Sequence, residues 1–290
     1  MTELIKKTLC NGKSLVAAVI SLVILAVFRI FVLLNGVDYT DGLNGLYSIS
    51  GNIYNIIYYI MLVAVLAVIS AAVVMDIKNP EKTYDTDIGT KGLITIGAVM
   101  IGIGAFQSVQ VINEFTTGIN IFSVFLILGC IAHIVGGVLI ASAKKLCPAH
   151  SVVAIAVIIS QLGAMIEFYM TNFLISKNPQ KLMMMLFLLS STFFWIYFGK
   201  ILTGNKKFLP KLFCVAGGLF STVLSLAFLI SSFVLLGIDP EKWIRLSYIP
   251  GLSMIPAMLL PGVTATVILL SGMKDKETAI EKISEEETAE

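Results

Sequence analysis

The sequence predicts an all-α fold, a bundle of about eight transmembrane helices arranged as four hairpins in one membrane domain. Hydrophobic residues make up 57% of the 290 residues and charged residues only 13%, whereas about a quarter of the residues in soluble domains are charged. The mean hydropathy is +0.94. Apolar runs of about 20 residues, the length that spans a bilayer as a helix, recur along the chain between short polar loops. We therefore expect an integral, multi-pass membrane protein surrounded by lipid.

Each apolar run that is long enough to cross a bilayer is a predicted span. The eight spans are residues 15–34, 53–75, 92–112, 119–142, 152–175, 182–202, 212–236 and 250–271. Residues 1–14 form a basic segment before them, residues 15–272 form the transmembrane domain, and residues 273–290 form a charged tail that we expect to be disordered. The first run is longer than the core of a signal peptide and no Ala-x-Ala cleavage site follows it, so we expect a retained helix.

Positive charges divide unequally between the two sets of loops. Fifteen lysines lie on the side of the two termini, and only four positive residues lie on the other side (Lys177, Lys181, Lys242 and Arg245). Because cytoplasmic loops carry the excess of Lys and Arg, both termini are predicted to be cytoplasmic, which favours the plasma membrane and an even number of spans.

Two segments near the end of the chain carry further structural signals. Asp239 is a plausible helix cap with Pro240 at the first helical position, which predicts a short surface helix on the outer side. Pro256 and Pro261 interrupt the last span and remove backbone hydrogen bonds from it. Broken helices present backbone groups to the solute in many transporters, although prolines also produce simple kinks in membrane helices.

Two opposite charges lie inside predicted spans, where charge is expensive. Arg29 lies about six residues from the outer end of the first span and Glu167 about eight from the outer end of the fifth, roughly 9 Å and 12 Å deep at 1.5 Å per residue. The two would form an ion pair if those spans touch, and Glu114 is the rival partner. Otherwise Arg29 extends to the interface or belongs to a solute or proton site.

Uncharged polar residues accompany these charges in the outer halves of the spans. The third span presents Gln107, Gln110 and Glu114 at i, i+3 and i+7, and the second presents Asn52, Asn55 and Tyr59. This concentration of polar residues in the outer halves of the spans favours a polar vestibule that opens outward, with Arg29 and Glu167 among its lining residues. The alternative is polarity at the interface combined with hydrogen bonds between helices.

The motifs of the common catalytic classes are missing from the sequence. It has no Walker-type phosphate loop, no HExxH pair and no GxSxG elbow, so we expect no catalytic residues, no cofactor and no metal. The basic residues form a cytoplasmic rim typical of lipid contact, not of nucleic-acid binding. Two functions remain: a transporter-like protein for a small polar or anionic solute, or a non-catalytic accessory, sensor or immunity-type subunit that packs against a partner membrane protein.

Overall fold

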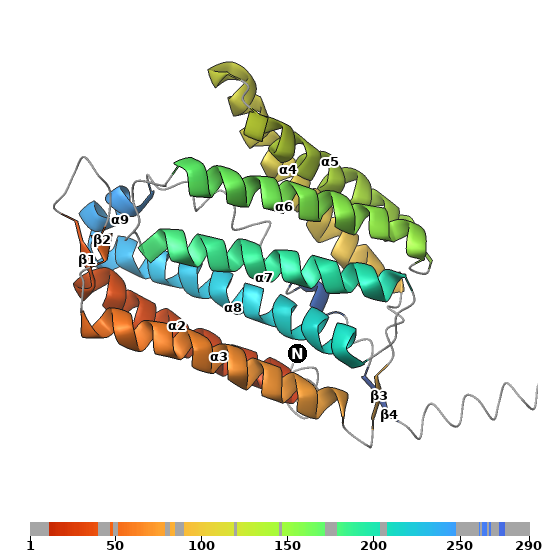
Figure 1. Ribbon diagram of the computed structural model, residues 1–290, viewed down its shortest axis with the longest axis horizontal. Helices are drawn as coiled ribbons and strands as arrows, with labels where there is room; N and C mark the ends of the chain where they lie inside the picture. Colours follow the sequence, from red (N-terminus) through yellow and green to blue (C-terminus); the bar gives the residue numbers. More distant parts are fainter. Residues whose placement is uncertain are drawn as a thin grey trace, which may run out of the picture.

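The computed structural model describes residues 12–39, 47–48, 52–78, 82–84, 90–118, 121–144, 147–171, 179–203, 208–247, 261, 263–265, 267 and 273–275. Within these residues the chain is a bundle of long helices (Figure 1). They are α2 (Lys13–Asn35), α3 (Ile53–Ile77), α4 (Thr90–Thr117), α5 (Ile121–Ser142), α6 (Ser151–Thr171), α7 (Pro179–Leu202) and α8 (Phe208–Ile238). All seven are long and apolar enough to cross a membrane. The chain is an all-α polytopic membrane bundle.

These seven helices match the first seven predicted spans. The largest extension is in α4, which continues to Thr117 where the apolar run predicted an end at residue 112. Four of the five extra residues are polar, so hydropathy alone does not reveal that the helix continues. The eighth predicted span, residues 250–271, lies outside the described residues except for 261, 263–265 and 267, which are helical.

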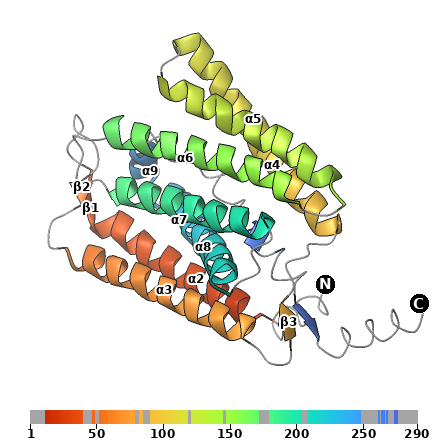
Figure 2. The same ribbon diagram turned by 45° about the vertical axis from the view of Figure 1, so that its right-hand side comes forward.

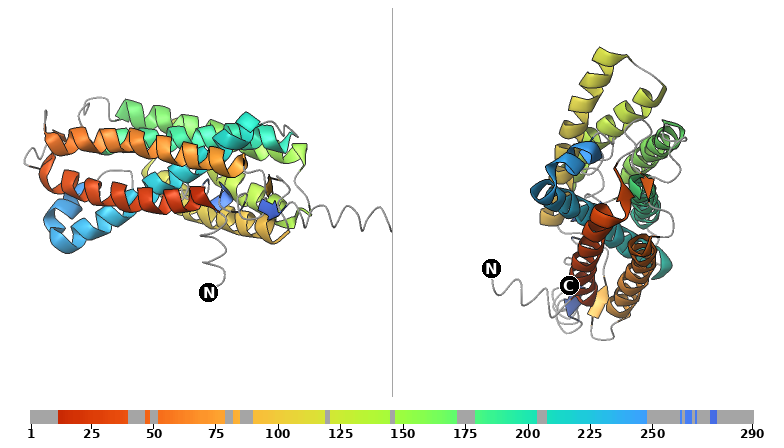
Figure 3. Two further views of the ribbon diagram at one scale, coloured as in Figure 1. Left: turned by 90° about the horizontal axis from the view of Figure 1, so that it is seen from below. Right: turned by 90° about the vertical axis from the view of Figure 1, so that its left-hand side faces the viewer.

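The predicted hairpins pack as pairs and then form a row. Helices α2 and α3, α4 and α5, and α6 and α7 contact one another, and α8 contacts α2, α3 and α7. Figure 2 shows α7 and α8 between the α2–α3 hairpin and α6. The end-on view in Figure 3 places the α2–α3 hairpin at one end of the row and the α4–α5 hairpin at the other. Consecutive hairpins are therefore not all neighbours.

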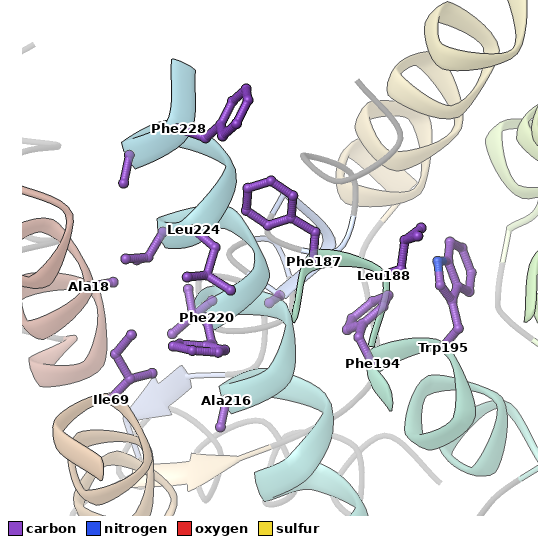
Figure 4. Packing of buried hydrophobic residues seen from close by; sticks show 14 of the residues in the cluster. Ala18, Ile69, Phe187, Leu188, Phe194, Trp195, Ala216, Phe220, Leu224 and Phe228 are labelled. Atoms are coloured by element: carbon purple, nitrogen blue, oxygen red, sulfur yellow. The ribbon is translucent and has the colours of Figure 1, made fainter. Parts of the chain in front are cut away.

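The core is centred on α8. Buried residues occupy 61% of its most apolar stretch, against 33% for α2. Figure 4 shows Phe228 of α8 beside Phe187 of α7, with 5.7 Å between the ring centroids, while Phe220 lies on the side of α8 that faces Ile69. A central helix of this kind joins elements that are distant in sequence.

The inner end of α2 is capped by a neighbouring helix. The second span was predicted to end at residue 75, but α3 continues to Ile77, and Asp76 lies buried in its last turn. Its carboxylate accepts hydrogen bonds from the backbone N–H groups of Lys13 (3.2 Å) and Ser14 (2.8 Å) and from the Ser14 hydroxyl. The first turn of a helix has free N–H groups, and Asp76 satisfies two of them, which joins α2 to α3.

Two short strand pairs lie at opposite ends of the bundle (Figure 1). Strand β1 (Val37–Asp38) pairs with β2 (Tyr47–Ser48), and β3 (Lys82–Tyr84) pairs with β4 (Met273–Asp275), both antiparallel. Residues 273–275 were expected to begin a disordered tail, but their backbone hydrogen bonds to β3 make them a strand. Helix α9 (Pro240–Ser247) lies at the end opposite to β4. Ser247 and Met273 therefore lie at opposite ends of the bundle.

Close contact between α4 and α5 generates a test of the packing. A Cβ atom on Gly97 would lie 2.5 Å from the Gly137 carbonyl oxygen, whereas one on Gly102 of the same helix would have nothing within 4 Å. We expect Gly97→Ala to lower the free energy of unfolding by about 1–3 kcal/mol because the helices must separate. Gly102→Ala should be neutral or stabilising by up to about 1 kcal/mol, from helix propensity. Equal effects in a detergent unfolding assay would contradict this packing.

Candidate functional site

Arg29 lies on the face of α2 that points into the bundle. The buried residues of this helix recur at helical spacing and include Leu25, Arg29 and Val32. Arg29 is 0% exposed, so its side chain does not reach the lipid-facing surface. Its position six residues before the end of α2 at Asn35 corresponds to a depth of about 9 Å. The structure therefore holds a guanidinium group inside the bundle, near the C-terminal end of α2.

Helices α3 and α8 supply the neighbours of this group. The guanidinium carbon lies 4.8 Å from the centroid of the Phe228 ring on α8, within the range of a cation–π interaction. The guanidinium group also interacts with the Tyr58 hydroxyl of α3. That hydroxyl donates a hydrogen bond to the Met183 sulfur of α7, at 3.1 Å. Side chains of four helices thus meet around one positive charge.

Tyr39 follows the C-terminal end of α2 and interacts electrostatically with Arg29. Its hydroxyl donates to the Leu33 carbonyl at 2.9 Å, and the Lys242 ammonium lies 5.4 Å from the centroid of its ring. Burial raises the pKa of the Tyr39 phenol, while the positive charge of Arg29 opposes that rise. Tyr39 therefore remains a neutral hydrogen-bonding group next to Arg29 at physiological pH.

The predicted surface helix is confirmed as α9. The Asp239 carboxylate accepts a hydrogen bond from the Lys242 backbone N–H at 3.1 Å and lies 3.3 Å from the Lys242 ammonium. The backbone hydrogen bond from Lys242 lowers the pKa of Asp239. Since the carboxylate caps α9, it fixes Lys242 over the outer end of the arginine cluster.

The polar residues predicted on α3 divide between two roles. The Asn52 side chain caps α3 and donates to the Asn35 carbonyl at 2.8 Å, and Asn55 donates to the Gly36 carbonyl at 2.9 Å. Both amides close the turn between α2 and α3. Tyr59 is 38% exposed, whereas Asn55 is buried, so these two predicted residues do not share one surface.

The remaining predicted residues lie on the other side of the row. Gln107 and Gln110 are half-buried on α4, and Glu167 is half-buried on α6; the Glu114 side chain lies outside the described part of the structure. The expected pairing of Arg29 with Glu167 required contact between the first and fifth spans. In the structure α7 and α8 lie between those helices (Figures 1 and 2). The predicted vestibule residues therefore form two groups.

Helices α6 and α7 are joined by a polar network. The Gln161 side chain donates to the Ser191 hydroxyl at 2.7 Å and accepts from the Thr192 hydroxyl at 3.1 Å. All three residues are buried. These three residues form hydrogen bonds between two helices. This is the arrangement that the alternative to a polar vestibule predicted.

The proline-containing last span is described only in part. Pro256 lies outside the described residues. Pro261 is helical, and its carbonyl oxygen is 2.6 Å from the position that a Cβ atom on Gly218 of α8 would occupy. Pro261 therefore lies against α8, the helix that carries Phe228.

Sequence analysis missed the residues that surround Arg29. Phe228 is one of many apolar residues in its span, and Met183 lies in an apolar run, so neither carries a signal of its own. Tyr58 could have been found from its depth, since a phenol hydroxyl inside a span needs a partner.

No family model matches the chain, and neither a curated protein nor a solved structure matches it.

Adjacent tyrosines on α3 offer a matched test of the arginine cluster. We expect Tyr58→Phe to lower the free energy of unfolding by about 1–3 kcal/mol, because hydrogen bonds to charged groups contribute roughly this much. Tyr59→Phe should change it by less than about 0.5 kcal/mol, as surface substitutions do. Detergent unfolding measures both variants. A Tyr58→Phe variant as stable as wild type would show that the hydroxyl does not support Arg29.

Proposed function

We propose that the protein is a transporter-like protein of the plasma membrane, with both termini in the cytoplasm, in which a small polar or anionic solute reaches Arg29 from the outer side. The observation that carries the proposal is the complete burial of the Arg29 guanidinium in the outer half of the bundle. Charged side chains inside membrane domains are costly and mark solute or ion pathways. The fixed positive charge selects for an anion.

The chemistry around Arg29 suits such a solute. The guanidinium is a planar group of hydrogen-bond donors that matches carboxylate and phosphate oxygens, and Tyr58 adds a hydroxyl beside it. Phe228 provides an aromatic surface at 4.8 Å. These groups combine charge, a hydroxyl and an apolar wall, as small-molecule sites commonly do.

Two features would provide the alternating access and the proton coupling that a transporter needs. The last span, with Pro256 and Pro261, would change its packing against α8 and so alternate access to Arg29. Glu167 on α6 would carry the coupling proton. The groups predicted on α4, Gln107, Gln110 and Glu114, would belong to the same outward-facing polar half.

A second candidate function is a non-catalytic accessory subunit, and specific hydrogen bonds favour it. Asn52, Asn55 and Gln161 all bond to neighbouring segments of the bundle. A bundle whose polar groups bond internally needs no solute and presents its surface to lipid or to a partner. Under this alternative Arg29 is a structural charge.

Anion-dependent stability distinguishes the two functions. Purified protein in detergent is melted in sodium salts of chloride, acetate, phosphate, sulfate and small dicarboxylates at equal ionic strength. A bound anion at about a hundred times its Kd would raise the free energy of unfolding by roughly 2.7 kcal/mol. We expect one class of anion to raise the melting temperature of wild type, Arg29→Gln to lose the shift, and Arg29→Lys to retain part of it.

The matched control is Lys242→Gln, which removes a positive charge from the outer surface and should keep the anion shift. If the shift persists in Arg29→Gln, the anion binds elsewhere and the proposed site is wrong. If no anion shifts wild type while Arg29→Gln is strongly destabilised, Arg29 is structural, and the accessory function is favoured.

A further inference from the structure

Three helices meet at Gly129 of α5, on the side of the bundle away from Arg29. A Cβ atom at this glycine would contact the Ser160 hydroxyl oxygen of α6, and it would lie 3.8 Å from the Gln107 side-chain nitrogen of α4. Gly129 is itself buried. The absence of a side chain at this position therefore lets polar groups from α4 and α6 approach the α5 backbone.

The imidazole of His133 contacts the backbone of the same glycine. Helical side chains lean toward the N-terminus of their helix, and His133 Nδ1 lies 2.7 Å from the Gly129 carbonyl oxygen, one turn earlier. A carbonyl only accepts hydrogen bonds, so Nδ1 carries the hydrogen. In the neutral imidazole Nε2 is then an acceptor. His133 is 2% exposed, so this acceptor is inside the membrane domain.

Two buried acceptors at this junction have no hydrogen bond to any residue that the structure describes, namely His133 Nε2 and Gln107 Oε1. Ser160 does not help, since its hydroxyl donates to the Phe125 carbonyl at 2.8 Å. The junction thus gathers acceptors whose donor must come from elsewhere.

We propose that the α4–α5–α6 junction binds a small molecule that donates at least two hydrogen bonds, one to His133 Nε2 and one to Gln107 Oε1. Water and the ammonium ion share this chemistry. A metal ion fits less well, because the described residues contain no cluster of three His, Cys, Asp or Glu side chains. Since α7 and α8 separate this junction from Arg29, the site does not depend on the proposed anion site, although Gln107 also belongs to the polar half of the proposed transporter.

The chain contains only two histidines, His133 and His150, which makes a spectroscopic test direct. His150→Gln leaves a single histidine, so nitrogen NMR of the histidine-labelled full-length protein reports on His133 alone. We expect an unprotonated Nε2 whose chemical shift is that of a hydrogen-bonded nitrogen. Gln107→Leu in the same background should move this resonance toward the value of a free lone pair. Gln110→Leu, one turn along α4, is the matched control and should leave it unchanged.

Ammonium chloride and potassium chloride then identify the donor, because the two cations are similar in size but only ammonium donates hydrogen bonds. A resonance that shifts with ammonium but not with potassium, and only while Gln107 is present, identifies ammonium. A hydrogen-bonded resonance that neither salt changes, but that Gln107→Leu abolishes, identifies water.

An Nε2 resonance with the shift of a free lone pair, or one that Gln107→Leu leaves unchanged, overturns the proposal. Because the histidine remains in place throughout, the result does not depend on whether a variant at His133 folds. If Gln107→Leu fails to fold, Gln107→Glu replaces it, since a carboxylate strengthens the acceptor and should increase the shift.

Discussion

The burial of the Arg29 charge is the constraint around which this half of the bundle is arranged. A guanidinium inside a membrane domain has no polar group on the lipid side to solvate it. The structure responds by turning Arg29 toward α8, where the Phe228 ring lies 4.8 Å away, and toward the Tyr58 hydroxyl of α3. This requires α8, distant in sequence, to lie against the α2–α3 hairpin. The position of α8 beside the α2–α3 hairpin therefore depends on the burial of the Arg29 charge.

Other polar groups are satisfied at the ends and seams of the bundle. Asp76 caps α2 from the neighbouring helix, Asn55 bonds the Gly36 carbonyl, and Gln161 joins α6 to α7. Glycines such as Gly97 allow α4 and α5 to approach until their backbones touch. Such contacts fix the register of helices that would otherwise slide, since lipid gives no hydrophobic force between them. Against this background, Arg29 and the Gly129 junction differ because they gather polar chemistry in the interior.

The helices could be read from the sequence because an apolar run of span length has one stable arrangement in a bilayer. Which helices contact one another could not be predicted from the apolar runs. Depth along a helix follows from residue number, so both charges were predicted toward the C-terminal ends of their helices, where Arg29 lies on α2 and Glu167 on α6. Side-by-side contact depends on packing between whole surfaces, and there α7 and α8 separate the two charges. Asp76 was missed as a cap because its partners, Lys13 and Ser14, are more than sixty residues away.

The most direct test of the central claim is whether water reaches the Arg29 cluster from outside. In a variant whose four native cysteines are replaced by serine, Phe228→Cys is treated in intact cells with a membrane-impermeant thiol reagent. Leu224→Cys, one turn deeper on α8 and fully buried, is the control. An open path to Arg29 predicts that Phe228→Cys reacts and Leu224→Cys does not. If both remain unreactive, the arginine lies in a closed, packed bundle, which would contradict the transporter-like function.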